Sequence, residues 1–346
     1  MTSDNFPDAL VTTETRDYDE PAVKLLAMSL LQFFPGTPDI ILICPEASDA
    51  LKAWAATQAR ITLDTTPLEG SFSYNVKPQT FERLFDQGHR KVMWFDSDVI
   101  IGPRFGEMVH PHLTTPIVVA EEPAITPYPP CAAMTAGFGW PVGRELHRVI
   151  NTGIVQLTSD HRELIADWKS ILLSDEYRET QFKPWNQRPA RMLGDQQVLT
   201  ALLGAEKYAD IPMVYLKEGT EIIQMFGPAG YSPADRLRQT KDGLPPIVHS
   251  MGHKPWRDHS LATQSRMRQV YDRLHGELSP YMDVARHVAG KHRPEFPWLD
   301  NANAVSSAMR WMTGNNVALA GLPLAVLDSS VRKTKRLLGL DEVKEA

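Results

Sequence analysis

The sequence predicts an α/β fold, with an open, mixed but mostly parallel sheet, helices on both faces and a C-terminal helical appendage. Over about the first 200 residues, short apolar runs alternate with helical patterns, which is typical of a parallel sheet covered by helices. One apolar run, residues 91–95, stops at two aspartates. Ligands of such sheets bind beyond the carboxyl ends of the strands. Beyond residue 257 the pattern becomes helical.

The predicted elements follow in the order strand, helix, strand. A fully apolar centre at 39–44 indicates a strand buried on both faces. Asp19 is expected to cap the first helix, with Pro21 in its first turn. The predicted strands are 9–13, 39–44, 60–65, 91–95, 116–120, 154–157 and 247–250, and the predicted helices are 23–34, 48–59, 78–87, 161–173 and one that starts at 194.

Residues 121–150 carry many prolines and glycines and no clear periodicity. A long loop inside a compact domain is usually functional or disordered. Its aromatic residues Tyr128, Phe138 and Trp140 favour a lid or a substrate platform, with plain loop packing as the alternative.

The chain is expected to divide into a catalytic domain, 1–257, and a helical appendage, 258–346. Helices are predicted at 262–278, 281–289 and 305–338, with breaks at Gly314 and Pro323. The last turns are basic, which indicates a solvated helix end or, alternatively, a weak peripheral contact with anionic lipid. The basic residues are Arg332, Lys333, Lys335 and Arg336.

The composition is that of an ordinary globular protein. The 346 residues are 42% hydrophobic and 23% charged, with a net charge of −6, so a nucleic acid is not expected as the partner. Two cysteines imply no disulfide framework, and Cys44 is predicted to be a buried thiol. A polar N-terminus without a signal pattern, and no apolar run near 18 residues, predict a cytoplasmic protein.

Asp96 and Asp98 are the strongest candidates for a metal site. In an extended chain they share one face while Ser97 points away. Two neighbouring carboxylates at the end of a buried strand repel each other unless a cation lies between them or one is protonated. Apolar triplets on both sides of the pair make a turn the less favoured interpretation.

His249 ends a second apolar strand and leads into Gly252 and Lys254. Glycine permits close approach of the backbone, and lysine supplies a point charge for phosphate. A lone histidine is more often structural. Together with Asp96 and Asp98, however, its imidazole would suit Mn²⁺ or Mg²⁺ with positions left for phosphate oxygens.

These two segments together resemble the family 8 retaining glycosyltransferases, which have a Rossmann-like GT-A fold and include glycogenin and bacterial galactosyltransferases. The resemblance spans roughly residues 9 to 256. It implies metal ligation by Asp96, Asp98 and His249, and contact of Gly252 and Lys254 with the donor phosphates. The late segment is one residue shorter than the family pattern, which leaves His253 as an alternative to Lys254.

Further matches to the family pattern imply the remaining donor-site residues. They are Thr12, Thr13 and Tyr18 near the nucleotide, Lys77 (or Arg83) at the diphosphate, Ser97 in the D-x-D segment, Asn151 in N-x-G, and Asp195 and Gln196 near the reacting face. Each has a plainer alternative. Tyr18 would pack on the first helix, Lys77 would be solvated, Asn151 would shape a turn and Asp195 would cap a helix.

The resemblance implies a metal-dependent transferase that moves a sugar from a nucleotide donor, with UDP preferred, to an acceptor hydroxyl with retention. The acceptor would be a sugar, a glycolipid or a polymer. Asp195, Gln196 and Lys254 are the expected catalytic residues. The alternatives are a metal-dependent nucleotidyltransferase and a non-catalytic module that binds nucleotide sugars or glycans.

Overall fold

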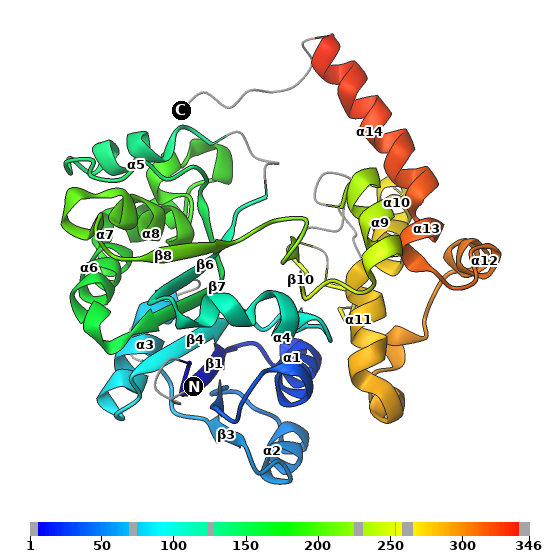
Figure 1. Ribbon diagram of the computed structural model, residues 1–346, viewed down its shortest axis with the longest axis horizontal. Helices are drawn as coiled ribbons and strands as arrows, with labels where there is room; N and C mark the ends of the chain where they lie inside the picture. The colour runs from blue at the N-terminus through cyan, green and yellow to red at the C-terminus, as the bar shows by residue number, and fades with distance from the viewer. Residues whose placement is uncertain are drawn as a thin grey trace.

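The structure is a computed structural model of the whole chain, and it describes residues 6–68, 75–123, 128–224, 231–252, 254–257 and 266–338. Figure 1 shows a sheet-and-helix body with a group of helices on one side, from which α14 (Leu322–Leu337) projects. Within the described ranges, no helix combines the length and the apolar composition that crossing a bilayer requires.

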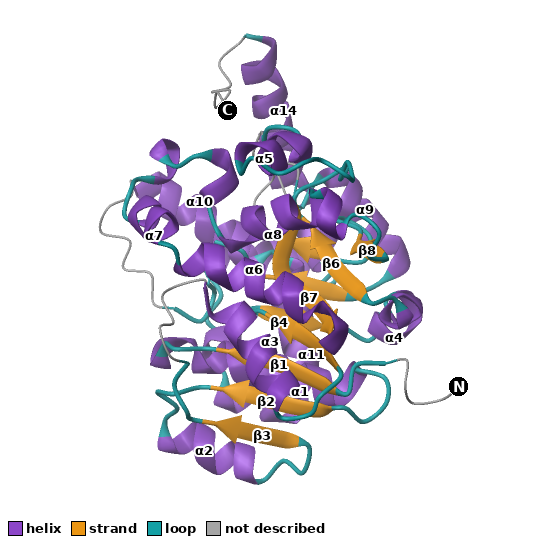
Figure 2. Cartoon of the chain, turned by 90° about the vertical axis from the view of Figure 1, so that its left-hand side faces the viewer, coloured by secondary structure: helices purple, strands orange, loops and turns teal. Residues whose placement is uncertain are grey.

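In the described residues the main sheet has seven strands in the order β3-β2-β1-β4-β7-β6-β8. Figure 2 shows them stacked from β3 to β8. Neighbouring strands are parallel, except that β7 runs antiparallel to both β4 and β6. The strands are β1 (Ala9–Thr13), β2 (Asp39–Ile43), β3 (Ile61–Asp64), β4 (Lys91–Phe95), β6 (Ile117–Glu121), β7 (Ile150–Thr158) and β8 (Met213–Leu216).

Alternate side chains of the central strands enter two different cores, because successive residues of a strand point to opposite faces. Val92 and Trp94 of β4 belong to the core under α3 (Val76–Asp86), α6 (Arg162–Leu173) and α8 (Asp195–Gly204). Met93 and Phe95 belong to the core under α1 (Glu20–Phe33) and α4 (Phe105–Met108). Both faces of the sheet are therefore covered, which explains the nearly continuous apolar strands. The predicted mixed, mostly parallel sheet with helices on both faces and C-terminal helices is confirmed.

The helices of the sheet-bearing part agree with most of the predicted positions. One short helix, α5, lies inside the segment 121–150 that was expected to be a loop; it packs on α8, and Thr135 donates to the carbonyl of Ala201 at 2.9 Å. The bounds are α1 (Glu20–Phe33), α2 (Asp49–Ala56), α3 (Val76–Asp86), α4 (Phe105–Met108), α5 (Cys131–Gly137), α6 (Arg162–Leu173), α7 (Asp175–Gln181), α8 (Asp195–Gly204) and α9 (Pro233–Asp242).

A small second sheet stands beside the main one. It has the order β5-β10-β9, with β5 antiparallel and β9 parallel to β10. Its three described strands are β5 (Val99–Ile101), β9 (Ile223–Gln224) and β10 (Ile247–His249). Because β5 follows β4 after only three residues, the segment 96–98 connects the two sheets.

The C-terminal helices pack on this small sheet. Residues of α11 share one apolar cluster with Leu25 and Met28 of α1 and with Val248 of β10. The division of the chain at residue 257 stays a prediction. Pro323 lies in the first turn of α14, where it starts a helix rather than ending one. The bounds are α10 (Arg266–Glu277), α11 (Pro280–Ala289), α12 (Ala304–Met312), α13 (Val317–Ala320) and α14 (Leu322–Leu337).

The backbone packs tightly at Gly102, just after β5: a Cβ there would lie closer than 3.0 Å to the carbonyl oxygen of Pro245. Gly102→Ala should lower the free energy of unfolding by about 1–3 kcal/mol through overpacking. Gly106→Ala is the matched control: its Cβ meets nothing within 4 Å and it lies in α4, so it should be neutral or stabilising by roughly 0.5–1 kcal/mol. Denaturant unfolding of both variants measures the difference; equal effects would contradict the described contact.

Candidate functional site

Asp96, Ser97 and Asp98 form a turn that connects β4 to β5, and not an extended strand. The amide of Val99 donates to the carbonyl of Asp96 at 3.0 Å, and the amide of Asp96 donates to the carbonyl of Gly153 on β7 at 2.8 Å. The expectation of an extended D-x-D segment was therefore wrong. The physical reason is that the chain leaves one sheet and enters another at this point. The turn still brings both carboxylates together.

The pairing of β5 with β10 brings His249 to the aspartates. His249 lies opposite Val99 in this antiparallel pair, and Val99 directly follows Asp98 in the chain. Its Nε2 lies 3.3 Å from Asp98 Oδ1 and 3.9 Å from Asp96 Oδ2. One ligand atom from each of the three residues falls within 4.8 Å of the others. The imidazole and both carboxylates therefore converge on one point.

Gln224 fixes the orientation and the tautomer of His249. The Gln224 amide nitrogen donates to the carbonyl of Glu121 at 2.7 Å and to the carboxylate of Glu218 at 2.9 Å. Its amide oxygen must then face His249 Nδ1, which lies 2.9 Å away. Nδ1 consequently carries the proton and donates it, so the lone pair of a neutral imidazole is on Nε2, directed at the aspartates. Gln224 was not predicted from the sequence.

Gly153 makes room for the histidine ring. A Cβ at this position would lie closer than 3.0 Å to the imidazole of His249. Its amide donates to the side-chain oxygen of Asn151 at 2.8 Å, and the Asn151 amide nitrogen donates to Glu122 at 2.7 Å. The N-x-G segment thus does more than shape a turn: it supports His249 on one side and Glu122 on the other.

Lys254 reaches the acidic pair from the segment after β10. Its ammonium pairs with Asp98 and donates to the carbonyl of Ser250 at 2.8 Å. Burial tends to raise the pKa of Asp98, but the charge of Lys254, together with that of His249 when its imidazole is protonated, outweighs burial and holds that pKa well below its ordinary value. Gly252 has a φ of 85°, in the left-handed region that favours glycine. His253 lies outside the described residues.

Lys77 is buried and lies between Asp96 and Asp195. Its Nζ is 3.2 Å from Asp96 Oδ1, 3.0 Å from Asp195 Oδ2 and 2.9 Å from the hydroxyl of Thr152. Burial would lower the pKa of Lys77, yet Asp195 and Asp96 raise it to about 12. Arg83, the alternative to Lys77, pairs with Asp64 at 3.1 Å instead.

These groups line a pocket of about 640 Å³ at the carboxyl ends of β1 and β4. Asp195 is the first residue of α8, after the N-cap residue Gly194, and its carboxylate accepts from Lys77 and from the hydroxyl of Thr152. Thr12 and Tyr18 are not among the described residues that line the pocket. Of the predicted site residues, those that line it are Thr13, Lys77, Asp96, Ser97, Asp98, Asn151, Asp195, Gln196, His249, Gly252 and Lys254.

Two further pocket residues escaped the sequence analysis. Glu122 follows β6 and bonds to Asn151 and, at 3.3 Å, to the hydroxyl of Tyr128. Burial raises its pKa, and hydrogen bonds from Asn151 and Gln196 offset only part of that rise. Gln197 is fully buried, lines the pocket, and neither polar atom of its side chain has a partner among the described residues. In the sequence, a carboxylate at the end of a predicted strand could have marked Glu122 as a site residue. No feature of the sequence marks Gln197 in this way.

Asp19 joins the segment after β1 to the segment after β10. Instead of capping α1, its carboxylate accepts from the indole of Trp256 at 2.8 Å and from Arg257 Nε at 2.8 Å, and it lies 3.0 Å from Arg16 Nε. Trp256 also packs against Tyr281 of α11 at 5.7 Å. This network, which we call the Asp19 clamp, fixes the backbone next to Lys254.

The aromatic residues expected to act as a lid have different surroundings. Tyr128 lines the pocket, whereas Phe138 and Trp140 stack on each other at 4.6 Å and pack against the core. Tyr18 is 55% exposed, with the guanidinium of Arg257 4.7 Å from its ring centre. Trp185, from a short 3-10 helix (Trp185–Gln187), also lines the pocket and is 43% exposed.

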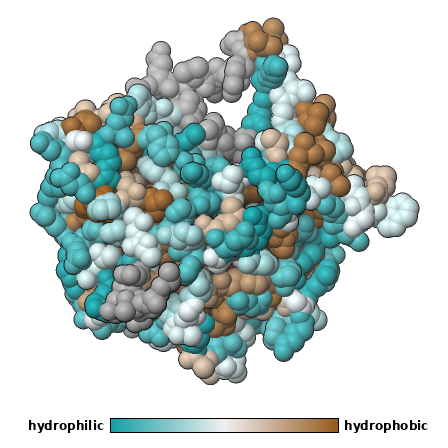
Figure 3. Space-filling model, viewed as in Figure 1, coloured by the Kyte–Doolittle hydropathy of each residue, from teal (hydrophilic) through white to brown (hydrophobic). Residues whose placement is uncertain are grey.

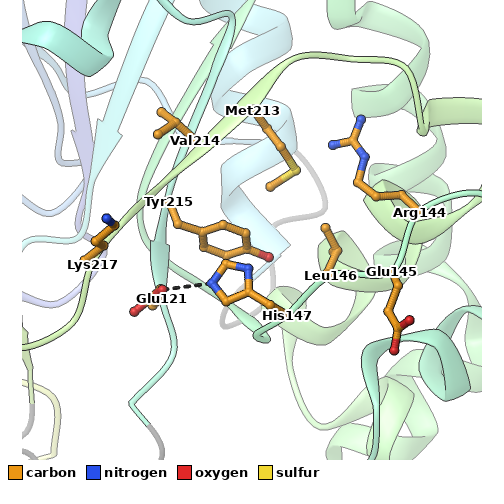
Figure 4. Close-up of a pocket in the computed structure, with 9 residues that line it drawn as sticks. All are labelled: Glu121, Arg144, Glu145, Leu146, His147, Met213, Val214, Tyr215 and Lys217. Atoms are coloured by element: carbon orange, nitrogen blue, oxygen red, sulfur yellow. Dashed lines mark hydrogen bonds and ion pairs between the residues drawn. The ribbon is translucent and has the colours of Figure 1, made fainter.

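A second pocket, of about 380 Å³, lies beside the edge strand β8 (Figure 4). Several of its polar groups bond to one another or to backbone: His147 Nε2 lies 2.9 Å from Glu121, and the hydroxyl of Tyr215 donates to the carbonyl of Arg148 at 2.8 Å. Arg144 donates to the carbonyl of Ala209 at 2.8 Å. These contacts are structural, so the larger pocket is the candidate active site.

The donor set around the acidic turn fits a hard divalent cation. Two carboxylates and one imidazole with an oriented Nε2 are a ligand set suited to Mn²⁺ or Mg²⁺. The Gln224–His249 bond is the kind of outer contact that orients a metal-binding histidine. Asp96, Asp98 and His249 would hold the ion.

Three solved structures that resemble this chain are glycosyltransferases. A glycosyltransferase involved in glycosylation of the major capsid of PBCV-1 has a TM-score of 0.40 at 13% identity, over 78% of this chain and 98% of that one. The galactosyltransferase LgtC, in complex with donor and acceptor sugar analogues, has a TM-score of 0.41 at 13% identity, over 76% of this chain and 95% of that one. The bifunctional glycosyltransferase WbbM has a TM-score of 0.46 at 14% identity, over 74% of this chain and 48% of that one.

The predicted resemblance to glycosyltransferases of the GT-A fold agrees with these matches. Neither the models of protein families nor the curated protein sequences gave a match to this chain.

Gly153→Ala should weaken metal binding although it replaces no metal ligand, because the added Cβ displaces the imidazole of His249. We expect Mn²⁺ affinity to fall by roughly 10-fold or more, as for loss of a residue that orients a ligand. Gly194→Ala is the matched pocket control, since its Cβ would meet Gln197 only at an ordinary 3.4 Å. Titration of Mn²⁺ into each folded variant measures this, and equal affinities would contradict the assignment.

Asp19→Asn should lower the free energy of unfolding at pH 7 by about 1–3 kcal/mol, because the cations of the clamp lose a buried carboxylate. Burial alone would raise the pKa of Asp19, but Arg257 and Trp256 lower it below 3.8. The stabilisation is therefore present above pH 3.8 and is lost as pH falls through the folded-state pKa. The difference from wild type should thus shrink on acidification. The exposed neighbour Asp17, changed to Asn, is the control and should have little effect.

Proposed function

We propose that this protein is a metal-dependent glycosyltransferase that moves a sugar from a nucleoside-diphosphate donor, UDP-linked by preference, to an acceptor hydroxyl with retention of configuration. The observation that carries the proposal is the convergence of Asp96, Asp98 and His249 in a pocket that also holds Lys77 and Lys254. A negatively charged donor needs such local cations, because the chain as a whole carries a net charge of −6.

The reaction breaks the bond between the anomeric carbon and the diphosphate, so negative charge grows on the leaving diphosphate. A bound Mn²⁺ or Mg²⁺ would stabilise that charge as a Lewis acid. Lys254 adds a cation from this chain: its ammonium already lies beside Asp98, within reach of phosphates bound there. We assign Lys254 to the leaving group, where its contribution is greatest in the transition state.

Lys77 is assigned a double task. Its contacts with Asp96 and Asp195 connect the metal site to the first turn of α8. It thereby holds Asp195 and, through the helix, Gln196 in the pocket, and it adds positive charge beside the diphosphate. The helix N-terminus contributes further partial positive charge to an anionic donor.

The acceptor side is assigned to the part of the pocket beyond Asp195. Glu122 is linked to Gln196, Asn151 and Tyr128, and its burial makes it suited to hydrogen-bond an acceptor hydroxyl. Gln197 offers two polar atoms that have no hydrogen-bond partner among the described residues. Trp185 and Tyr128 supply aromatic surface for a sugar ring. A sugar, a glycolipid or a polymer fits this description of the acceptor.

The test is metal-dependent release of nucleoside diphosphate from a panel of nucleotide sugars. Wild type should release diphosphate with Mn²⁺ and lose this activity with a chelator. Asp98→Ala should reduce turnover by roughly 10²-fold or more. Lys254→Ala should lower kcat more than it changes the acceptor KM. Glu107→Ala, an exposed acid on α4 outside the pocket, should behave as wild type.

The same assay separates the alternatives. Donor affinity without diphosphate release indicates a binding module. Release of pyrophosphate from a nucleoside triphosphate indicates a nucleotidyltransferase. Unchanged turnover of Asp98→Ala would overturn the proposal directly.

A further inference from the structure

The C-terminal helix α14 has an exposed apolar face. Four of its apolar side chains, and that of Leu338 just beyond its end, are 47–78% exposed. They recur at intervals of four, seven and eleven residues, which places them on one side of a helix. Figure 1 shows α14 projecting from the body, and Figure 3 shows apolar surface along it. The five are Val326 (49%), Leu327 (65%), Val331 (47%), Leu337 (78%) and Leu338 (66%).

The opposite, inward side of α14 is partly polar. Asp328 receives a hydrogen bond from the hydroxyl of Tyr271 on α10 and pairs with Arg332 Nε at 2.9 Å, while Ala325 is fully buried. A surface helix usually buries its apolar stripe and exposes its polar one. Here most of the apolar side chains face outward, and the described part of the chain leaves them about half exposed or more.

Charge distinguishes this helix from the rest of the protein. Between residues 322 and 338 there are four basic residues and one acidic residue, whereas the whole chain has a net charge of −6. At 3.6 residues per turn, the exposed Lys333 and Lys335 lie on the two flanks of the apolar face. Lysines in that position keep their charge in water while their stems cover apolar surface.

A second exposed apolar site lies at the end of α12. Trp311 is 80% exposed and Met312 69% exposed, and α12 packs against α13, which leads directly into α14. Tryptophan is enriched where proteins meet the headgroup region of a bilayer. Exposed apolar residues, flanking lysines and a tryptophan are the features of a helix that lies in the membrane interface.

We propose that α14, with the end of α12, binds the surface of an anionic lipid bilayer, with its apolar face inserted at the level of the headgroups. Positive charge on a protein that is otherwise acidic complements a negative lipid surface. The same charge disfavours a second copy of the chain as the occupant. A two-fold contact through this face would place equal surfaces together and bring the lysines of both copies near one another.

The experiment uses the full chain and co-sedimentation with vesicles, a readout that does not depend on catalysis. We expect binding to vesicles that contain phosphatidylglycerol and little binding to phosphatidylcholine alone. Raised salt should weaken it, since exposed charges are screened. Lys333→Glu with Lys335→Glu should reduce binding by about fivefold or more per residue. Leu327→Ser with Val331→Ser and Leu338→Ser should abolish it.

Matched controls separate the face from general effects of charge or apolar surface. Lys52→Glu with Lys183→Glu changes the same charge on other exposed sites, and Phe182→Ser removes an apolar side chain that is 77% exposed. Both should bind as wild type, and thermal unfolding should show that all variants are folded. Equal binding to neutral and anionic vesicles, or no binding, would overturn the proposal. So would a wild-type dimer in sedimentation velocity that the apolar variant converts to monomer, because a second copy would then cover the face.

Discussion

The structure of the pocket depends on how the negative charge of two neighbouring aspartates is balanced. Asp98 is almost buried, and a buried carboxylate without a partner is costly. Lys254 and His249 lie beside Asp98, and Lys77 lies beside Asp96. These three groups come from α3, β10 and the segment after it. The acidic turn therefore draws parts of the chain that are distant in sequence to one point.

The second sheet explains how this convergence is achieved. β5 continues the chain from the acidic turn and pairs with β10, so the register of one short antiparallel pair places His249 beside Asp98. β9 adds Gln224 on the far side of the imidazole, and β7 supplies Gly153, whose missing side chain leaves space for the ring. The pairing of β5 with β10 thus sets the position of His249, Gln224 sets its tautomer, and Gly153 leaves space for the orientation of its ring.

Positions of most elements could be predicted from the sequence, because apolar periodicity depends on local contacts with a core. β1 to β4 and α6 were expected nearly where they lie. The direction of β7 could not be predicted, since parallel and antiparallel strands buried on both faces have the same apolar pattern. α5 was missed because its small residues gave no amphipathic pattern, and its stability comes from packing on α8. The three-residue strand β5 was too short to show alternation.

The sequence by itself determined the chemical groups of the candidate site: paired carboxylates at a strand end, a histidine and lysine near residue 250, and a lysine before the acidic pair. These are properties of residue type and order. Only the tertiary structure decided that Asp96 and Asp98 meet through a turn and that Asp19 holds Trp256 instead of capping a helix. It also decided that Glu122 and Gln197 line the pocket and that Gln224 orients His249. Such contacts join residues many positions apart, and hydrogen-bond partners of that kind leave no periodic trace in the chain.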